Sequence, residues 1–157
     1  MKKYINAIAN IVMEPVSLFP DEALIFVHTI RTDEEDPSKM HEFRCYCEVN
    51  VVGTIDGDEE NPIDNKKNLQ FKVRVTKLSD IKEEQLCIDL FEFEIDCSDE
   101  KLIEKDNYLK HINYRALIDV PSLKNIPCKG KYSLRVLVKE NTDDKYEVQS
   151  TTVFNVI

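Results

Sequence analysis

The chain has 157 residues, 42% hydrophobic and 32% charged, a composition typical of one soluble globular domain. Its formal net charge of −9 argues against general binding to nucleic acid or to an anionic membrane, because both need a cationic surface. No apolar run approaches the roughly 20 residues of a membrane-spanning helix. The chain has only three glycines, none of them in a phosphate-binding loop pattern, which excludes a P-loop and a dinucleotide fingerprint.

The start of the chain, residues 1–17, resembles a signal peptide in being basic and then apolar. Asn6 and Asn10 interrupt the apolar part, and Glu14 follows it, so we interpret the segment as a first strand. The chain has five cysteines, an odd number. Without a signal peptide, that number predicts reduced thiols and a cytoplasmic protein.

Apolar and polar residues alternate along most of the chain, which predicts strands with one face on a core and the other in water. The run 23–30 is apolar throughout and predicts a strand covered on both faces. In 86–97 the apolar face changes near Leu90, which predicts a β-bulge or a crossing between sheets. The segment 98–109 is the best helix candidate, with Ser98 as its cap. We expect eight strands, near residues 5–13, 23–31, 43–55, 68–78, 86–97, 110–120, 132–139 and 146–156.

This pattern predicts an all-β fold: an antiparallel β-sandwich of about 7–8 strands, immunoglobulin-like or Greek-key, with at most one or two short helices. No linker or repeat divides the chain, so we expect residues 1–157 to form a single β-sandwich domain.

The last third of the chain carries a family resemblance. Gly130 and Tyr132 open an alternating strand, a polar turn follows, and a second alternating strand runs from Val148 to Val156. This arrangement resembles the closing hairpin of immunoglobulin-like sandwiches, including bacterial and phage proteins of unknown function. The resemblance covers about a fifth of the chain and implies a fold without an activity; the tryptophan and cysteine pair of true immunoglobulin domains are missing.

The acidic stretch "GTIDGDEENPIDN" at 53–65 raises the question of a calcium site. An EF-hand loop starting at Asp56 would need glycine where Asn61 stands and glutamate where Lys67 stands, so that motif fails. We expect a solvated hairpin tip and no metal site. A looser calcium site between acidic loops is the alternative, and its candidate ligands are Asp56, Asp58, Glu60 and Asp64.

No other pattern points to catalysis or to a cofactor. Cys45 and Cys47 share one strand face and are expected to pack in the core; a zinc site would need His41 or Cys128, neither with suitable spacing. His28 and His111 are isolated. The acidic residues Glu92, Glu94 and Asp96 of the expected strand 86–97 are expected to face water. We therefore expect no enzyme activity and no cofactor, with an unrecognised type of enzyme as an alternative.

Charge is segregated along the chain. Residues 80–106 hold eleven acids and three lysines, whereas 107–139 hold one acid and seven lysines or arginines. The simple interpretation is that these segments pair across a sheet; the functional one is a bipolar surface that recruits protein partners or copies of the chain. The candidate interaction surface is Lys110, Arg115, Lys129, Lys131 and Arg135.

We therefore predict a non-catalytic protein-binding or structural module, of the kind found among bacterial or phage accessory proteins. Its expected partner is another protein or a second copy, not nucleic acid and not a membrane. The alternative from a different class is a module that binds calcium or a ligand through its acidic loops.

Overall fold

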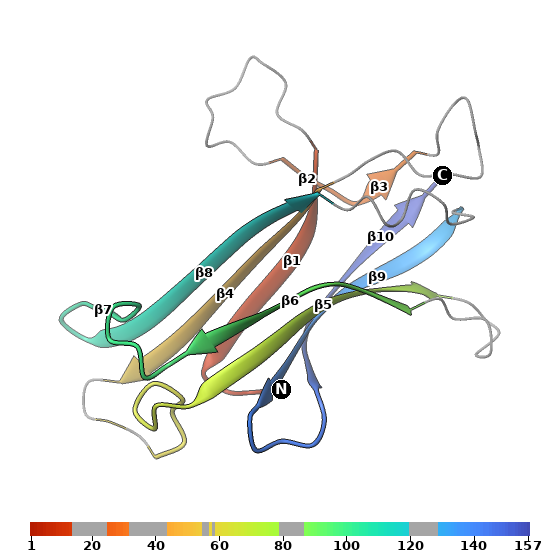
Figure 1. Ribbon diagram of the computed structural model, residues 1–157. Coiled ribbons are helices and arrows are strands. Elements are labelled where there is room, and N and C mark those ends of the chain that lie inside the picture. The colour runs from red at the N-terminus through yellow and green to blue at the C-terminus, as the bar shows by residue number, and fades with distance from the viewer. Residues whose placement is uncertain (14–24, 32–43, 55–56, 58, 79–86, 120–128) are drawn as a thin grey trace.

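The computed structural model describes residues 1–13, 25–31, 44–54, 57, 59–78, 87–119 and 129–157. These residues form two five-stranded sheets packed face to face, so the predicted all-β sandwich is confirmed (Figure 1). No helix occurs within the described ranges, and hence none that could cross a membrane.

We call the two sheets A and B. Sheet A has the order β2-β1-β4-β8-β7, and sheet B has the order β3-β10-β9-β5-β6. All described neighbours pair antiparallel except β10 and β3. The strands are β1 (Ile5–Met13), β2 (Ile25–Val27), β3 (Thr29–Ile30), β4 (Arg44–Thr54), β5 (Asn68–Leu78), β6 (Cys87–Asp96), β7 (Glu104–Lys105), β8 (Leu109–Asp119), β9 (Gly130–Glu140) and β10 (Glu147–Val156).

The core lies between the two sheets and is built from every second residue of the long strands. β4 contributes Cys45, Cys47, Val49 and Val51, all fully buried, as the alternation predicted. The corresponding residues of β5 and β9 are also buried: Leu69, Phe71, Val73, Val75, Tyr132, Leu134, Val136 and Val138. The ring of Tyr132 stacks on Phe154 of β10 at 5.2 Å, which fixes the closing hairpin that the sequence predicted.

The expected strand 23–31 is two short strands in different sheets. β2 pairs with β1 of sheet A, and β3 pairs with the end of β10 in sheet B. The chain passes from one sheet to the other at His28, which is exposed and accepts a backbone hydrogen bond from Asn155. The apolar run therefore reflects this crossing and not a single strand covered on both faces.

The predicted change of face in β6 is confirmed as a β-bulge. On β5, Val73 pairs with Phe91 and the next residue, Arg74, pairs with Asp89, so Leu90 is the extra residue.

The helix predicted at 98–109 is wrong. The segment forms a turn with i→i+3 backbone bonds and then the short strand β7. Asp106 accepts hydrogen bonds from the backbone N–H groups of Tyr108 and Leu109, at 2.8 and 2.7 Å, and so turns the chain into β8.

One lateral side of the sandwich is closed by hydrogen bonds from a buried glutamine. Gln149 of β10 donates to the backbone carbonyls of Lys2 and Ile5 and accepts from the Lys2 N–H. Its side chain is 6% exposed, and it lies at a register shift in β10. These bonds join sheet B to the N-terminal end of β1 in sheet A, because Ile5 is the first residue of β1.

Candidate protein-binding site

The other lateral side of the sandwich carries the last long strand of each sheet, β6 and β8. Figure 1 shows these two strands running in opposite directions in adjacent layers. Along the described part of the chain, β6 pairs only with β5, and its outer edge has no partner strand. The short strand β7 covers β8 at Lys110 and His111 only. Both edges therefore offer backbone N–H and C=O groups for pairing.

The apolar side chains between these two edges are only partly covered. We call this set the β6–β8 seam. It consists of Ile88, Leu90, Phe91, Phe93 and Tyr114, all packed against the core and none fully buried. Phe93 stacks on Tyr114 across the two sheets, with ring centroids 4.0 Å apart, and on Phe71 at 4.9 Å. A row of aromatic rings thus fills the seam but remains partly accessible to solvent.

Acidic side chains follow the outer face of β6, next to the seam. Asp89 receives two hydrogen bonds from Arg74, the shorter at 2.6 Å, and this guanidinium lowers the pKa of the Asp89 carboxyl. Lys72 lies 3.2 Å from Glu92, whose side chain is still 61% exposed. Among the described residues, Asp89 and Glu92 of β6 thus pair with cations of β5, so the prediction that 80–106 pairs with 107–139 is wrong for β6. It holds for the short strand β7, which pairs with β8 and places Glu104 3.0 Å from His111.

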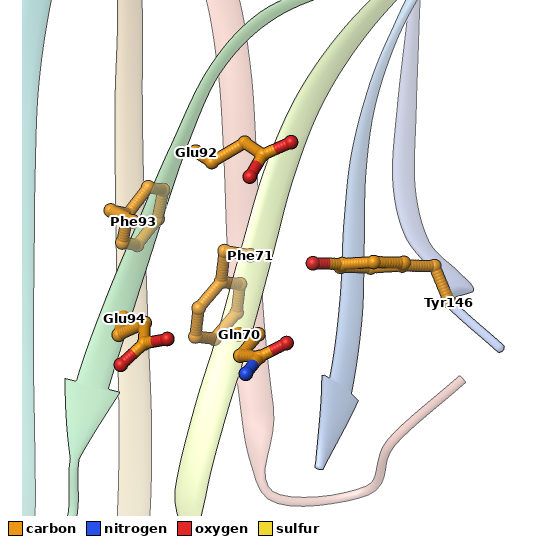
Figure 2. A pocket seen from close by; sticks show the side chains of 6 residues that line it. All are labelled: Gln70, Phe71, Glu92, Phe93, Glu94 and Tyr146. Atoms are coloured by element: carbon orange, nitrogen blue, oxygen red, sulfur yellow. The ribbon is translucent and has the colours of Figure 1, made fainter. Parts of the chain in front are cut away.

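A shallow hollow of about 190 Å³ lies on this acidic face. Figure 2 shows the Tyr146 hydroxyl pointing toward β5 and β6, on the side where Gln70, Glu92 and Glu94 lie. Lys72 and Lys139 hold the ring, with their Nζ atoms 4.6 and 5.1 Å from its centroid. Two carboxylates, one amide and three aromatic rings line this shallow hollow, which suits a polypeptide lying across it better than an enclosed small molecule.

The outer face of β8 is polar and carries a cation beside the seam. Arg115 is 66% exposed, and its Nε atom lies 3.7 Å from Glu48 of β4. Asn113 and Tyr46 donate hydrogen bonds to the same carboxylate, and the bond from Tyr46 lowers the Glu48 pKa most. Arg115 is therefore loosely held, with much of its hydrogen-bonding capacity facing solvent.

A second polar hollow, of about 450 Å³, lies at the end of the sandwich and includes Asp64, Cys97 and Lys110. Lys110 binds Asp64 at 2.8 Å, so each neutralises the other. Cys97 is 1% exposed, and burial raises the pKa of its thiol to about 11. That thiol is protonated near neutral pH and is not an activated nucleophile.

The structure places the calcium candidates only in part. Asp56 and Asp58 lie outside the described residues, as do His41 and Cys128. Glu60 is exposed, and Asp64 binds Lys110. No group of three or more potential metal-ligating side chains occurs in the parts of the chain that the structure describes.

The described part of the acidic loop divides in two: Glu59 and Glu60 are exposed, as expected of a solvated tip, whereas residues 61–63 after them are buried. Asn61 is fully buried: its side-chain amide donates to the Val52 carbonyl at 2.7 Å, and its Oδ1 accepts from the Ile63 N–H at 2.9 Å. Ile63 is 4% exposed and belongs to the core. Residues 61–63 therefore fold back onto the end of the sandwich.

The five basic candidates do not form one patch. Lys110 and Arg115 lie on β8 in sheet A, and Lys110 is occupied by Asp64. Lys131 and Arg135 lie on β9 in sheet B, and Lys129 directly precedes that strand. Of the five, only Arg115 is both exposed and next to the seam. Sequence reasoning missed the seam itself, because nothing local marks β6 and β8 as edge strands.

The predicted core position of Cys45 and Cys47 is confirmed. Both are fully buried, and burial raises the pKa of each thiol to about 12. Cys45, Cys47, Cys87 and Cys97 are free thiols, and of these only Cys87 is exposed.

No family model matches the sequence, and no curated protein is detectably similar to it. Among solved structures, the chain is similar to the CooA pilin subunit from enterotoxigenic Escherichia coli, with 11% identity and a TM-score of 0.39. The similarity covers 95% of this chain and 98% of the pilin chain. A likeness of this size does not establish a shared function.

Proposed function

We propose that this protein is a non-catalytic module that binds another polypeptide by adding an extended strand along the β6–β8 seam. The observation that supports this most is the combination of two strand edges, that of β6 unpaired and that of β8 paired only with β7 among the residues that the structure describes, with partly exposed aromatic residues between them. Main-chain hydrogen bonds supply affinity in this mode of binding, and side chains at alternate positions supply specificity.

The chemistry beside β6 indicates which strand would fit. Its seam-facing residues Phe91, Phe93 and Ile95 favour apolar side chains on one face of the added strand. Its outward residues Glu92 and Glu94 favour lysine or arginine on the other face. The same acids would disfavour acidic or uniformly apolar strands, so they restrict the choice of partner as well as protecting the edge.

A synthetic peptide with the sequence of β5, LQFKVRV, is a direct probe, because this is the strand that β6 already accepts on its other side. We expect it to shift the backbone NMR resonances of β6 when titrated into the labelled protein. A peptide of the same composition with both cations on the apolar face should bind at least tenfold more weakly. Equal binding of both peptides, or no shift in β6 at millimolar peptide, would overturn the proposal.

A further inference from the structure

The β5 strand shows what kind of sequence β6 accepts. In the antiparallel register between them, Phe71 lies opposite Phe93 and Lys72 opposite Glu92. Leu69 lies opposite Ile95 on the inward face. A strand with aliphatic, aromatic and cationic side chains in this order is thus complementary to β6 within the molecule itself.

The β8 strand has the same order of side chains. Residues 111–116 read HINYRA, and residues 68–73 of β5 read NLQFKV. Position by position, each run has a polar residue, an aliphatic residue, an amide, an aromatic ring, a cation and a small aliphatic residue. The two runs also have the same orientation, since Ile112 and Tyr114 face the core as Leu69 and Phe71 do. β8 is therefore a chemical match for the free side of β6.

The two edges cannot pair within one chain, because β6 and β8 belong to different sheets. They can pair between two chains. A two-fold axis parallel to the strands, placed between the layers at the seam, brings sheet B of one copy level with sheet A of the other. Because β6 and β8 run in opposite directions (Figure 1), this rotation makes the new pairs antiparallel.

We infer that this chain forms a two-fold symmetric dimer in which β6 of each copy pairs with β8 of the other, with Phe93 opposite Tyr114. The inference rests on the proposed function, since it uses the same seam, and it names the partner as a second copy. In this register Glu92 lies opposite Arg115, Glu94 opposite Asn113, and Ile95 opposite Ile112.

The aromatic rings and charges of the seam account for the stability of such a pair. Two Phe93–Tyr114 stacks, one from each copy, come together around the axis and cover the partly exposed rings. Arg115, 66% exposed in one copy, gains Glu92 of the other, which is 61% exposed. The pairing ends at Ile112, because β7 already occupies the edge of β8 at His111.

Charge reversal with rescue by mixing tests this arrangement. Glu92→Arg places two cations opposite each other in a homodimer, and Arg115→Glu places two acids opposite each other. Each variant alone should dimerise at least tenfold more weakly than the wild type in sedimentation equilibrium from about 1 µM to about 1 mM. An equimolar mixture should regain dimers, because both cross-copy pairs then have opposite charges. Lys131→Glu, an exposed reversal on β9, is the matched control and should dimerise normally.

The outcomes separate this inference from the proposed function. Circular dichroism and thermal melting of each variant show whether it folds, and rescue on mixing cannot come from unfolded chains. A wild type that stays monomeric at about 1 mM, or a mixture that is not rescued, overturns the dimer. A monomer that binds the LQFKVRV peptide on β6 overturns the dimer and leaves strand addition standing; a monomer that does not bind it overturns both.

Discussion

The rings of Phe93 in β6 of sheet B and Tyr114 in β8 of sheet A stack nearly parallel, with centroids 4.0 Å apart and planes tilted by 9°. On the opposite side of the sandwich, Gln149 joins the sheets through three hydrogen bonds to the start of the chain. The two sides therefore differ in kind: one is closed by directional polar contacts, and the other by apolar rings that a further strand can cover.

The Phe93–Tyr114 stack is expected to couple the two sheets energetically. In a double-mutant cycle with Phe93→Ala and Tyr114→Ala, measured by urea denaturation of the monomer, the coupling free energy should be about 0.5–1.5 kcal/mol. Tyr114→Phe serves as the control and should keep the coupling, because the ring and not the hydroxyl makes the contact. A coupling near zero would contradict the stacked arrangement.

Gln149 is expected to be important for stability on the closed side. Gln149→Ala removes three hydrogen bonds and leaves the buried Ile5 carbonyl without that donor, so the free energy of unfolding should fall by about 2–3 kcal/mol. Thr151→Ala, at an exposed position on the same strand, should change it by less than about 0.5 kcal/mol. Equal effects of the two substitutions would show that the glutamine does not join the sheets.

The described cysteines should differ sharply in reactivity. Cys87 is exposed, whereas burial raises the pKa of Cys45 and Cys47 to about 12 and that of Cys97 to about 11. In the folded protein at about pH 8, iodoacetamide should therefore alkylate Cys87 and leave the other three unmodified until urea is added. Mass spectrometry of the digested peptides measures this, and rapid native labelling of Cys45 would disprove the core position.

Asp89 should contribute to the pH dependence of stability. Its pKa is lowered in the folded protein, chiefly by the hydrogen bond from Arg74, so the ionised form stabilises the fold above the ordinary value of 3.8. This contribution is lost as the pH falls through that value toward the lowered pKa. Because the side chain is 35% exposed, we expect about 1 kcal/mol or less.

Urea denaturation between about pH 5 and about pH 2 checks the contribution of Asp89. The loss of stability on acidification should be smaller in Asp89→Asn than in the wild type. Thr151→Ala, an exposed substitution that removes no carboxylate, should retain the wild-type difference between the ends of that range. If the free energy of unfolding fell more on acidification in Asp89→Asn than in the wild type, the Asp89 pKa would not be lowered in the folded protein.

Local periodicity predicted the strands well, because burial on one face is visible in the order of residues. The observed bounds of β1 and β5 are those expected from alternation, and the bulge at Leu90 was visible as a change of face. The crossing at His28 was not predictable, since an apolar run has the same pattern whether it stays in one sheet or passes between two. The helix at 98–109 failed because Ser98, its expected cap, bonds back to Asp96, and Asp99 accepts from the Lys101 N–H in a turn.

The candidate site could not be predicted, because an edge is a property of strand order and not of any one strand. Glu92 and Glu94 were correctly placed on a water-facing side, yet their position beside an unpaired edge depends on which strand lies next to β6. In the same way, Arg115 was selected for its charge, and only the fold separates it from Lys131 and Arg135 on the other sheet.

Amide hydrogen exchange in β6 measures whether this edge accepts an added strand. The amides of Phe91 to Ile95 that do not bond to β5 should exchange rapidly in dilute protein and slow at least tenfold when the LQFKVRV peptide is added or the protein is concentrated. Amides of the central strand β9 should not change, which provides the internal reference. If the β6 amides exchange at the same rate under all three conditions, the seam accepts no strand, and both strand addition and the dimer are wrong.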